Sequence, residues 1–277
     1  MAALLVLALA VVVPAAPAAE TASPWAPAAT AKIHPGVQMY TQGAQCTANF
    51  IYTDSLNRVY VGYAAHCAGL GEATDTNGCS TTSVPLGTTV RFAEGGTAFS
   101  AGTTLGYGKL VYSSWITMRM LGEKRADVCA YNDLALVRLN ATAARSVNPS
   151  VPFWGGPVGV DTDGTAAGSR IYSYGDSSLR AGISVLGPKL GISLGSSAQD
   201  WTTDVFTATP GVPGDSGSGM LDGQGKAIGV LSTLALAPLP GSNGVGDLSR
   251  ELRYARAHSG IDGLRLVPGT EKFSPIL

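Results

Sequence analysis

The chain of 277 residues is long enough to form one large or two small hydrophobic cores. Charged residues make up only 13% of it and the net charge is −1, without basic or acidic runs, which argues against nucleic acid or an anionic membrane surface as a partner. The 36 glycines and the hydrophobic share of 45% indicate a turn-rich, β-rich protein rather than a disordered one.

The first segment has the features of an export signal. Ala2 to Val13 is an uninterrupted apolar run, and the Ala/Pro segment that follows, which includes Ala16-Pro17-Ala18, suits a signal peptidase. The run is too short to span a membrane, and no Lys or Arg precedes it. We expect a signal peptide over residues 1–19, a leader or short propeptide over residues 20–32, and a secreted extracellular protein free of the membrane after cleavage; a membrane anchor is the alternative.

Short strand-like segments recur between turn signals from Ile33 onward, where we expect ordered structure to begin. The predicted strands of the first half are residues 36–40, 46–52, 58–63, 88–92, 103–112 and 134–139. After a linker at residues 140–152, the predicted strands are 170–174, 184–193, 204–208 and 227–236. The series favours antiparallel barrels or sandwiches, and we divide it into two similar β units, residues 33–145 and 146–277.

Helical periodicity is rare in this sequence. In the stretch from Leu248 to His258, Leu248, Leu252 and Ala255 recur at helical spacing, which predicts one amphipathic helix packed on the second unit. The polar residues on its other faces are Arg250, Glu251, Arg253 and Arg256. Residues 115–125 have a weaker helical pattern, and we assign no helix there.

The glycine-rich segment 211–219 contains Ser216 among small neighbours. Its four glycines and one proline predict a sharp turn that other atoms can approach closely. Such a turn can present a serine hydroxyl as a nucleophile and direct backbone N–H groups toward a developing oxyanion. An ordinary surface turn is the alternative explanation.

A serine nucleophile needs a base, and the sequence offers three histidines: His34, His66 and His258. Of these, His66 lies beside a cysteine and after two alanines, in a setting that suits an imidazole fixed at the end of a strand. Asp133 heads the apolar segment 134–139, where a carboxylate is costly to bury unless a donor such as an imidazole N–H meets it. A structural histidine and an aspartate that caps a turn with Asn132 are the alternatives.

Four cysteines in an exported chain predict two disulfide bonds. They can pair in three ways, and they are Cys46, Cys67, Cys79 and Cys129. No two of them form a C-x-x-C pair, so structural zinc is a poor interpretation. We expect no cofactor and no metal, since no acidic loop typical of calcium sites is present either.

Taken together, these motifs resemble the trypsin/chymotrypsin-like serine peptidases, in character most of all their secreted bacterial members. The segment Tyr63 to Cys67 is similar to the family's T-A-A-H-C motif, with Tyr63 in place of a hydroxyl residue. Asp133 to Leu139 resembles the D-I-A-L-L-R-L strand, and Gly214 to Gly217 is the G-D-S-G loop. Ser173-Tyr174-Gly175 stands where the family has a Gly-aromatic-Gly turn, and the order His, Asp, Ser is also the family's.

The resemblance implies an all-β fold of two antiparallel six-stranded β-barrels with a C-terminal helix, and an active site between the barrels. In this family the counterparts of Ser216, His66 and Asp133 are the nucleophile, the general acid and base, and the partner that orients the histidine. The N–H groups of Gly214 and Ser216 would form the oxyanion hole. The resemblance implies two disulfide pairs, Cys46–Cys67 and, from the cysteines that remain, Cys79–Cys129.

Asp215 needs a cationic partner according to the same resemblance. Many animal members supply a new N-terminus, and Lys32-Ile33 could be such a cleavage site, but only a short segment separates Ile33 from the first cysteine. Secreted bacterial members supply an internal arginine instead. We therefore predict an internal partner and select Arg170.

The predicted substrate-binding residues are Pro210, Ser232 and Leu234. Pro210 stands where trypsin-like members carry an aspartate for basic side chains, and Leu234 stands where the family usually has a glycine that keeps the pocket open. These replacements predict a shallow apolar pocket that favours small residues on the amino side of the cleaved bond (P1).

The sequence thus predicts a secreted, monomeric serine endopeptidase that hydrolyses peptide or protein substrates through an acyl-enzyme intermediate. Two alternatives remain open. One is a noncatalytic binding protein that retains the peptidase fold, and the other is an exported esterase, although the order His, Asp, Ser and the absence of a G-x-S-x-G elbow argue against the latter.

Overall fold

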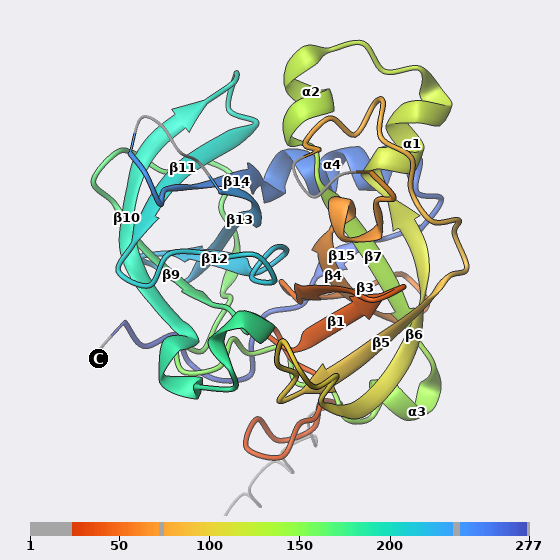
Figure 1. Ribbon diagram of the computed structural model, residues 1–277, viewed down its shortest axis with the longest axis vertical. Helices are drawn as coiled ribbons and strands as arrows, with labels where there is room; N and C mark the ends of the chain where they lie inside the picture. Colours follow the sequence, from red (N-terminus) through yellow and green to blue (C-terminus); the bar gives the residue numbers. More distant parts are fainter. Residues whose placement is uncertain (1–23, 72–74, 235–238, 276–277) are drawn as a thin grey trace, which may run out of the picture.

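The computed structural model describes residues 24–71, 75–234 and 239–275 (Figure 1). The predicted signal peptide, residues 1–19, lies outside this part of the chain, as do residues 20–23 of the predicted leader. Trp25 packs against the core and Ala26 N donates to Val147 O at 2.9 Å, so packed structure begins before Ile33, earlier than predicted. Within the three described ranges, no helix combines the length and apolar character needed to cross a bilayer.

The first β unit is an eight-stranded antiparallel sheet with the order β15-β3-β4-β7-β6-β5-β1-β2. Its strands are β1 (Gln38–Thr41), β2 (Ala44–Thr47), β3 (Ile51–Thr53), β4 (Val59–Ala64), β5 (Thr89–Glu94), β6 (Thr103–Ser113), β7 (Leu134–Leu139) and β15 (Arg265–Leu266). The hydrogen-bonded order is open, so the prediction of a six-stranded barrel is wrong for this unit.

The difference has two causes. The predicted strand 46–52 bends at residues 48–50, and its halves β2 and β3 pair with different neighbours. Ala48 N donates to Val37 O and Asn49 N to Gly62 O, so the bend itself contacts both sides of the sheet. In addition, β15 comes from near the end of the chain and pairs with β3, which extends the sheet and crosses the predicted boundary between the units.

The second β unit contains a closed six-stranded antiparallel barrel, as predicted. Its sheet order is β12-β9-β10-β11-β14-β13-β8, and a further pairing of β12 with β13 closes the barrel while β8 adds to β13 in parallel. The strands are β8 (Gly159–Val160), β9 (Arg170–Tyr174), β10 (Pro188–Ser197), β11 (Thr202–Thr207), β12 (Gly219–Asp222), β13 (Lys226–Leu234) and β14 (Asn243–Asp247). The two units lie side by side in Figure 1.

The helices of the described residues are short. They are α1 (Ser114–Leu121), α2 (Ala126–Tyr131), α3 (Ala141–Ala144) and α4 (Leu248–His258), with 3₁₀ turns at Ala65–Ala68, Ser178–Arg180 and Ser184–Leu186. The prediction of no helix at residues 115–125 is wrong, because α1 covers most of this stretch. Ser113 caps its start by accepting from Ile116 N, and Gly122 ends it in the left-handed conformation (φ 63°).

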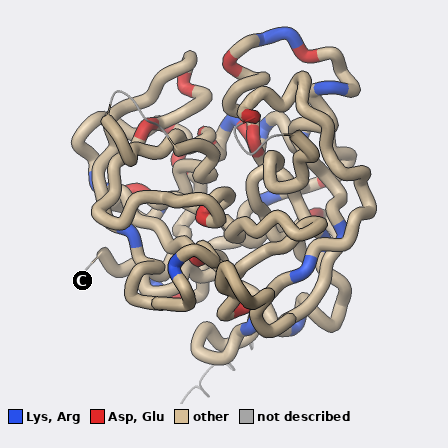
Figure 2. The backbone as a smooth tube through the Cα atoms, viewed as in Figure 1, with Lys and Arg blue, Asp and Glu red and all other residues tan. Residues whose placement is uncertain are grey.

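Helix α4 is confirmed with its predicted bounds and buries Leu248, Leu252 and Ala255. It lies between the two units in Figure 1 and packs on β7 and β13, which belong to different sheets. Glu251, which the periodicity placed on a polar face, is also fully buried. Figure 2 shows acidic and basic residues scattered over both units, and both signs occur together on the segment between α1 and α2.

Candidate active site

His66 lies in the 3₁₀ turn that directly follows β4. The neighbouring residues fix this turn, because Cys67 is bonded to Cys46 and Ala65 N donates to Asp133 O at 2.8 Å. The imidazole remains accessible, with 22% of the side chain exposed. The turn therefore holds the ring in one place at the end of a strand, as the sequence predicted, and leaves it accessible.

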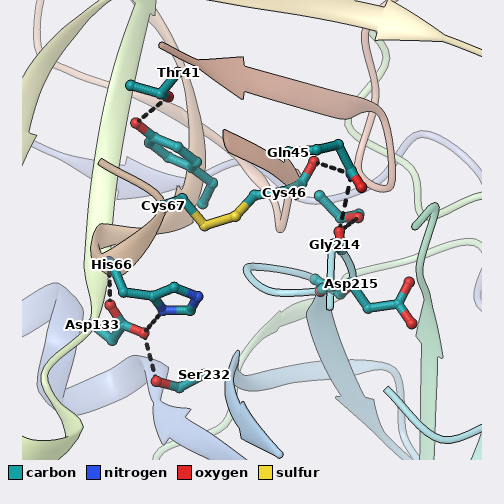
Figure 3. The surroundings of a disulfide bond; sticks show 12 residues. Thr41, Gln45, Cys46, His66, Cys67, Asp133, Gly214, Asp215 and Ser232 are labelled. Carbon is teal, nitrogen blue, oxygen red and sulfur yellow. Dashed lines mark hydrogen bonds and ion pairs between the residues drawn. A yellow bond between two sulfur atoms is a disulfide. The ribbon is translucent and has the colours of Figure 1, made fainter. Parts of the chain in front are cut away.

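The other two histidines lie elsewhere. His34 Nδ1 bonds to Pro35 O, and the His258 ring lies against the ring of Tyr254. Neither belongs to the group of residues around His66. Tyr63, which departs from the family motif, is fully buried and shares a 3.1 Å hydrogen bond with Thr41 Oγ1 (Figure 3).

The carboxylate of Asp133 holds the imidazole of His66. It lies just before β7, is 2% exposed, and accepts from His66 N at 2.8 Å through Oδ1 and from His66 Nδ1 at 2.6 Å through Oδ2. Ser232 Oγ donates to the same Oδ2 (Figure 3). Because the carboxylate accepts from Nδ1, that nitrogen carries a proton and Nε2 of a neutral imidazole is left as the acceptor. The ring is thus in the tautomer that a general base requires.

The environment of His66 favours its charged form. Burial acts to lower the pKa of His66, but the charge of Asp133 and its hydrogen bond outweigh burial, so that the pKa is raised above its ordinary value of 6.5. The same carboxylate would stabilise an imidazolium formed when His66 accepts a proton.

The glycine loop around Ser216 packs against β2 and the end of β4. Thr47 N donates to Ser216 O at 2.9 Å, and Thr47 Oγ1 and Gln45 Nε2 donate to Gly214 O at 2.8 and 3.0 Å. A Cβ on Gly217 would lie only 2.8 Å from Ala64 N, two residues before His66, so the loop and the histidine turn are neighbours. Within the described residues, Ser216 Oγ makes no hydrogen bond to His66.

Two backbone amides of this loop have no acceptor among the described residues, namely those of Gly214 and Ser216. The amides that alternate with them are paired, since Asp215 N donates to Val212 O and Gly217 N to Leu231 O. Gly214 has φ +94°, and a Cβ there would overlap Gln45 Oε1. The unpaired amides are available to a negatively charged oxygen beside Ser216.

Asp215 is fully buried and has two cationic partners. Arg180 Nη2 lies 2.6 Å and Lys189 Nζ 2.9 Å from its Oδ2. The backbone N–H of Ser177 also donates to the carboxylate, at 3.1 Å. The predicted internal partner therefore exists, but the choice of Arg170 is wrong, because that residue is exposed at the far end of β9 while Arg180 lies in the turn after it.

The three predicted substrate-binding residues have different surroundings. Ser232 is bonded to Asp133, a contact that sequence reasoning did not foresee, and Pro210 O accepts from Arg180 Nη2 at 2.7 Å. Leu234 is 48% exposed at the end of β13, next to residues outside the described ranges. Buried Asn243 connects the residues that directly follow Pro210 and Ser232: its Oδ1 accepts from Gly211 N at 2.8 Å, and its Nδ2 donates to Thr233 O at 3.2 Å. The sequence carried no signal for Asn243.

Both predicted disulfides are confirmed, Cys46–Cys67 and Cys79–Cys129. The first joins β2, which supports the glycine loop, to the histidine turn. The second joins the loop after that turn to α2. Only the first lies within the candidate site, where Figure 3 shows it between His66 and Gly214.

The architecture is that of the chymotrypsin-like serine proteases. Among solved structures, Thermobifida fusca protease A matches 86% of this chain and 99% of its own, with a TM-score of 0.51 and 18% identity. The Nocardiopsis protease NAPase covers 84% of this chain and 98% of its own (TM-score 0.49, 21% identity). Cellulomonas bogoriensis chymotrypsin covers 85% and 99% (TM-score 0.49, 18% identity).

No protein-family model matches the sequence, and no curated protein matches it either. The likeness to Thermobifida fusca protease A extends over most of the chain and, at 18% identity, shows the fold. The fold that the resemblance of the sequence motifs implies is thus supported by the comparison of three-dimensional structures.

Proposed function

We propose that this protein is a serine endopeptidase in which Ser216 is the nucleophile, His66 the general acid and base, and Asp133 the residue that orients His66. The observation that carries the proposal is the 2.6 Å bond between His66 Nδ1 and Asp133 Oδ2, beside a loop in which two amides have no acceptor among the described residues. A bonded histidine and aspartate alone would suit many structural roles. Their position beside a loop that carries Ser216 and two N–H groups without an acceptor among the described residues suits acyl transfer.

The proposed reaction has two halves. Ser216 Oγ attacks the substrate carbonyl carbon while His66 Nε2 accepts the hydroxyl proton, and the N–H groups of Gly214 and Ser216 bind the oxyanion. His66 then donates that proton to the departing amine, which leaves an acyl ester on Ser216. In the second half, water attacks the acyl carbon and gives a proton to His66 Nε2. The bond from that carbon to Ser216 Oγ then breaks, His66 returns the proton to Ser216 Oγ, and the acid is released. Asp133 stays ionised throughout and stabilises the imidazolium.

The absence of a Ser216–His66 hydrogen bond is compatible with this mechanism. Bonds between a nucleophile and its base are often long or poorly aligned in a free enzyme and tighten when substrate binds. The backbone of the loop, by contrast, is already fixed through Thr47 and Gln45.

For the substrate we propose peptides or proteins cleaved after small apolar P1 residues. Pro210 offers no charge to a basic side chain, and Asn243 ties Gly211 to Thr233 and so limits the space between their segments. A peptide-library cleavage profile tests this proposal directly. We expect Ala, Val and similar residues at P1, and a profile dominated by Phe, Tyr, Lys or Arg would contradict it.

We further propose that the protein is secreted after removal of residues 1–19 and acts as a monomer, without cofactor or metal. Two disulfides suit an oxidising compartment. Amino-terminal sequencing of exported protein would locate the cleavage site, and retention of the protein inside the producing cell would contradict secretion.

The decisive experiment is labelling of the mature protein with a fluorophosphonate probe, read by peptide mass spectrometry. We expect modification at Ser216 that is lost in Ser216→Ala and retained in Ser274→Ala, a control at an exposed serine. Folded protein that does not react, even after removal of the leader, would favour the noncatalytic binding protein. Hydrolysis of ester substrates without any cleavage of matched peptide amides would favour the esterase.

A further inference from the structure

A second carboxyl group lies directly behind the candidate triad. Glu251 projects from α4, is fully buried, and its Oε1 accepts from the backbone N–H of Asp133 at 2.7 Å. The side chain of Asp133 is meanwhile engaged with His66 and Ser232. Asp133 is therefore held at both ends, by the groups around its carboxylate and by Glu251 at its backbone.

No positive charge accompanies this buried glutamate within the described residues. The groups that interact with it electrostatically are the phenols of Tyr52 on β3 and Tyr112 on β6 and the carboxylates of Asp133 and Asp247. Its Oε2 has no hydrogen-bond partner in the described part of the chain. An ionised carboxylate in such surroundings would be strongly disfavoured.

The pKa of Glu251 follows from the same surroundings. Burial raises the pKa of Glu251 well above its usual range, and the charges of Asp133 and Asp247 act in the same direction, against the single backbone hydrogen bond from Asp133. Glu251 thus carries its proton under conditions where an exposed glutamate is ionised.

The chain makes room for this carboxyl group. A Cβ on Gly246 would lie 2.6 Å from Glu251 Oε1 and 2.9 Å from Tyr131 O, so only glycine lets the helix approach the segment that leads into Asp133. Gly246 lies one residue before Asp247, which ends β14 and caps α4 by accepting from Arg250 N. The start of the helix, and with it Glu251, is positioned by these two residues.

We propose that Glu251 acts as a neutral carboxylic acid that positions Asp133, so that the Asp133 carboxylate meets His66 Nδ1. The effect of Glu251 on catalysis rests on the proposed function, whereas its neutral state and its contact with Asp133 do not. The neutral form matters because an ionised Glu251 would place a second negative charge behind Asp133. That charge would also attract the imidazolium of His66 and would couple to the titration of His66. Glu251 is a positioning residue, since it reaches the imidazole only through Asp133.

The test compares Glu251→Gln, which keeps an accepting oxygen without charge, with Glu251→Met, which keeps the volume but removes the acceptor. Infrared difference spectra of wild type against Glu251→Gln should contain the carbonyl stretch of a protonated carboxylic acid. The pKa of His66, measured by NMR titration, should stay close to wild type in Glu251→Gln and fall by about one unit in Glu251→Met. Fluorophosphonate labelling of Ser216 should slow by about 100-fold in Glu251→Met and recover largely in Glu251→Gln.

Each alternative gives a different result. If Glu251 is ionised, the acid band is missing and Glu251→Gln lowers the pKa of His66, because a nearby negative charge has been removed; this overturns neutrality. If Glu251→Met leaves both the His66 pKa and the labelling rate unchanged, positioning is overturned. If Glu251→Met does not fold, Glu251→Asp replaces it. The shorter side chain withdraws the carboxyl group by one methylene, and we again expect a lower His66 pKa and slower labelling.

The exposed Glu271→Gln variant is the matched control and should alter none of these quantities. If no form of the protein reacts with the probe, the proposed function fails. The infrared band and the His66 titration still decide the role of Glu251 in that event.

Discussion

The ammonium group of Lys189 lies 2.9 Å from the carboxylate of Asp215, and neither side chain is exposed to solvent. Arg180, 10% exposed, approaches the same carboxylate oxygen at 2.6 Å. Burial lowers the pKa of Lys189, Asp215 raises it, and Arg180 lowers it further, with a net lowering. One buried anion thus has two cations, and it lies next to Ser216 in the sequence.

This arrangement predicts non-additive losses of stability. Arg180→Ala and Lys189→Met should each lower the free energy of unfolding by about 1–2 kcal/mol, because Asp215 keeps one cation. The double variant leaves a buried carboxylate without a counter-charge and should lose about 3–5 kcal/mol beyond the sum of the single losses. Urea unfolding measures all three, Arg170→Ala serves as a control without effect, and purely additive losses would contradict the prediction.

The pH dependence of the reaction should follow His66. Its raised pKa means that the imidazole stays protonated, and hence inactive as a base, to a pH above 6.5. The acid limb of kcat/KM should therefore have its midpoint above 6.5, and activity should fall as the pH drops through it. Asp133→Asn should move that midpoint down and lower kcat by about 10⁴-fold. A midpoint that is the same in both proteins would mean that another group controls the limb.

Asp176 should lower stability at neutral pH. Burial, reinforced by the charge of Asp215, raises the pKa of Asp176 to about 6. Its contribution to folding is therefore most favourable below pH 3.8 and is lost as the pH rises through about 6, where the half-buried carboxyl ionises. Asp176→Asn should gain about 1–2 kcal/mol at pH 8 and nothing at pH 3. Equal effects at both pH values in thermal unfolding would count against this shift.

Removal of either disulfide should lower stability, but only removal of Cys46–Cys67 should also slow the labelling of Ser216. The two disulfides close segments of 21 and 50 residues, and each loss should lower the free energy of unfolding by about 2–5 kcal/mol. Cys46→Ala/Cys67→Ala should also slow probe labelling by about tenfold or more, because this bridge joins β2, which holds the glycine loop, to the turn that carries His66. Cys79→Ala/Cys129→Ala is the comparison and should label at the wild-type rate while folded. Equal labelling rates in both pairs would remove the catalytic part of the prediction.

Gly214 should be indispensable for reactivity. Its φ of +94° and the overlap of an added Cβ with Gln45 mean that Gly214→Ala must shift the loop and its free N–H groups. We expect probe labelling to slow by about 100- to 1,000-fold. Gly223→Ala, at a position with open space and no positive φ, is the control. Labelling of Gly214→Ala at the wild-type rate would exclude an oxyanion role for this loop.

Local motifs predicted the parts of the site that adjoin one another in sequence. Residue types and their order point to His66 with Cys67 and to Asp133 at the head of its strand, whereas the closed second barrel is what the family resemblance implies. The bond between His66 and Asp133 was proposed from the cost of burying a carboxylate, and the structure shows it.

Contacts between distant segments were harder to predict. The sequence analysis selected Arg170 as the cation for Asp215, whereas the path of the chain after β9 brings Arg180 and Lys189 to that carboxylate. Glu251 lies in a helical pattern that predicts a polar face, since periodicity does not reveal that α4 packs on strands of both sheets. The open first sheet is hard to predict for the same reason, because the pairing of β15 with β3 joins residues more than two hundred positions apart.

That pairing also bears on how the protein is made. β3 is synthesised more than two hundred residues before its neighbour β15, so the first sheet reaches its full width only after residue 266 has left the ribosome. Folding that proceeds one unit after the other from the amino terminus would leave this edge of β3 exposed until then. An exported chain avoids the exposure if it is held unfolded until translocation is complete, and the two halves should then fold together as one cooperative body.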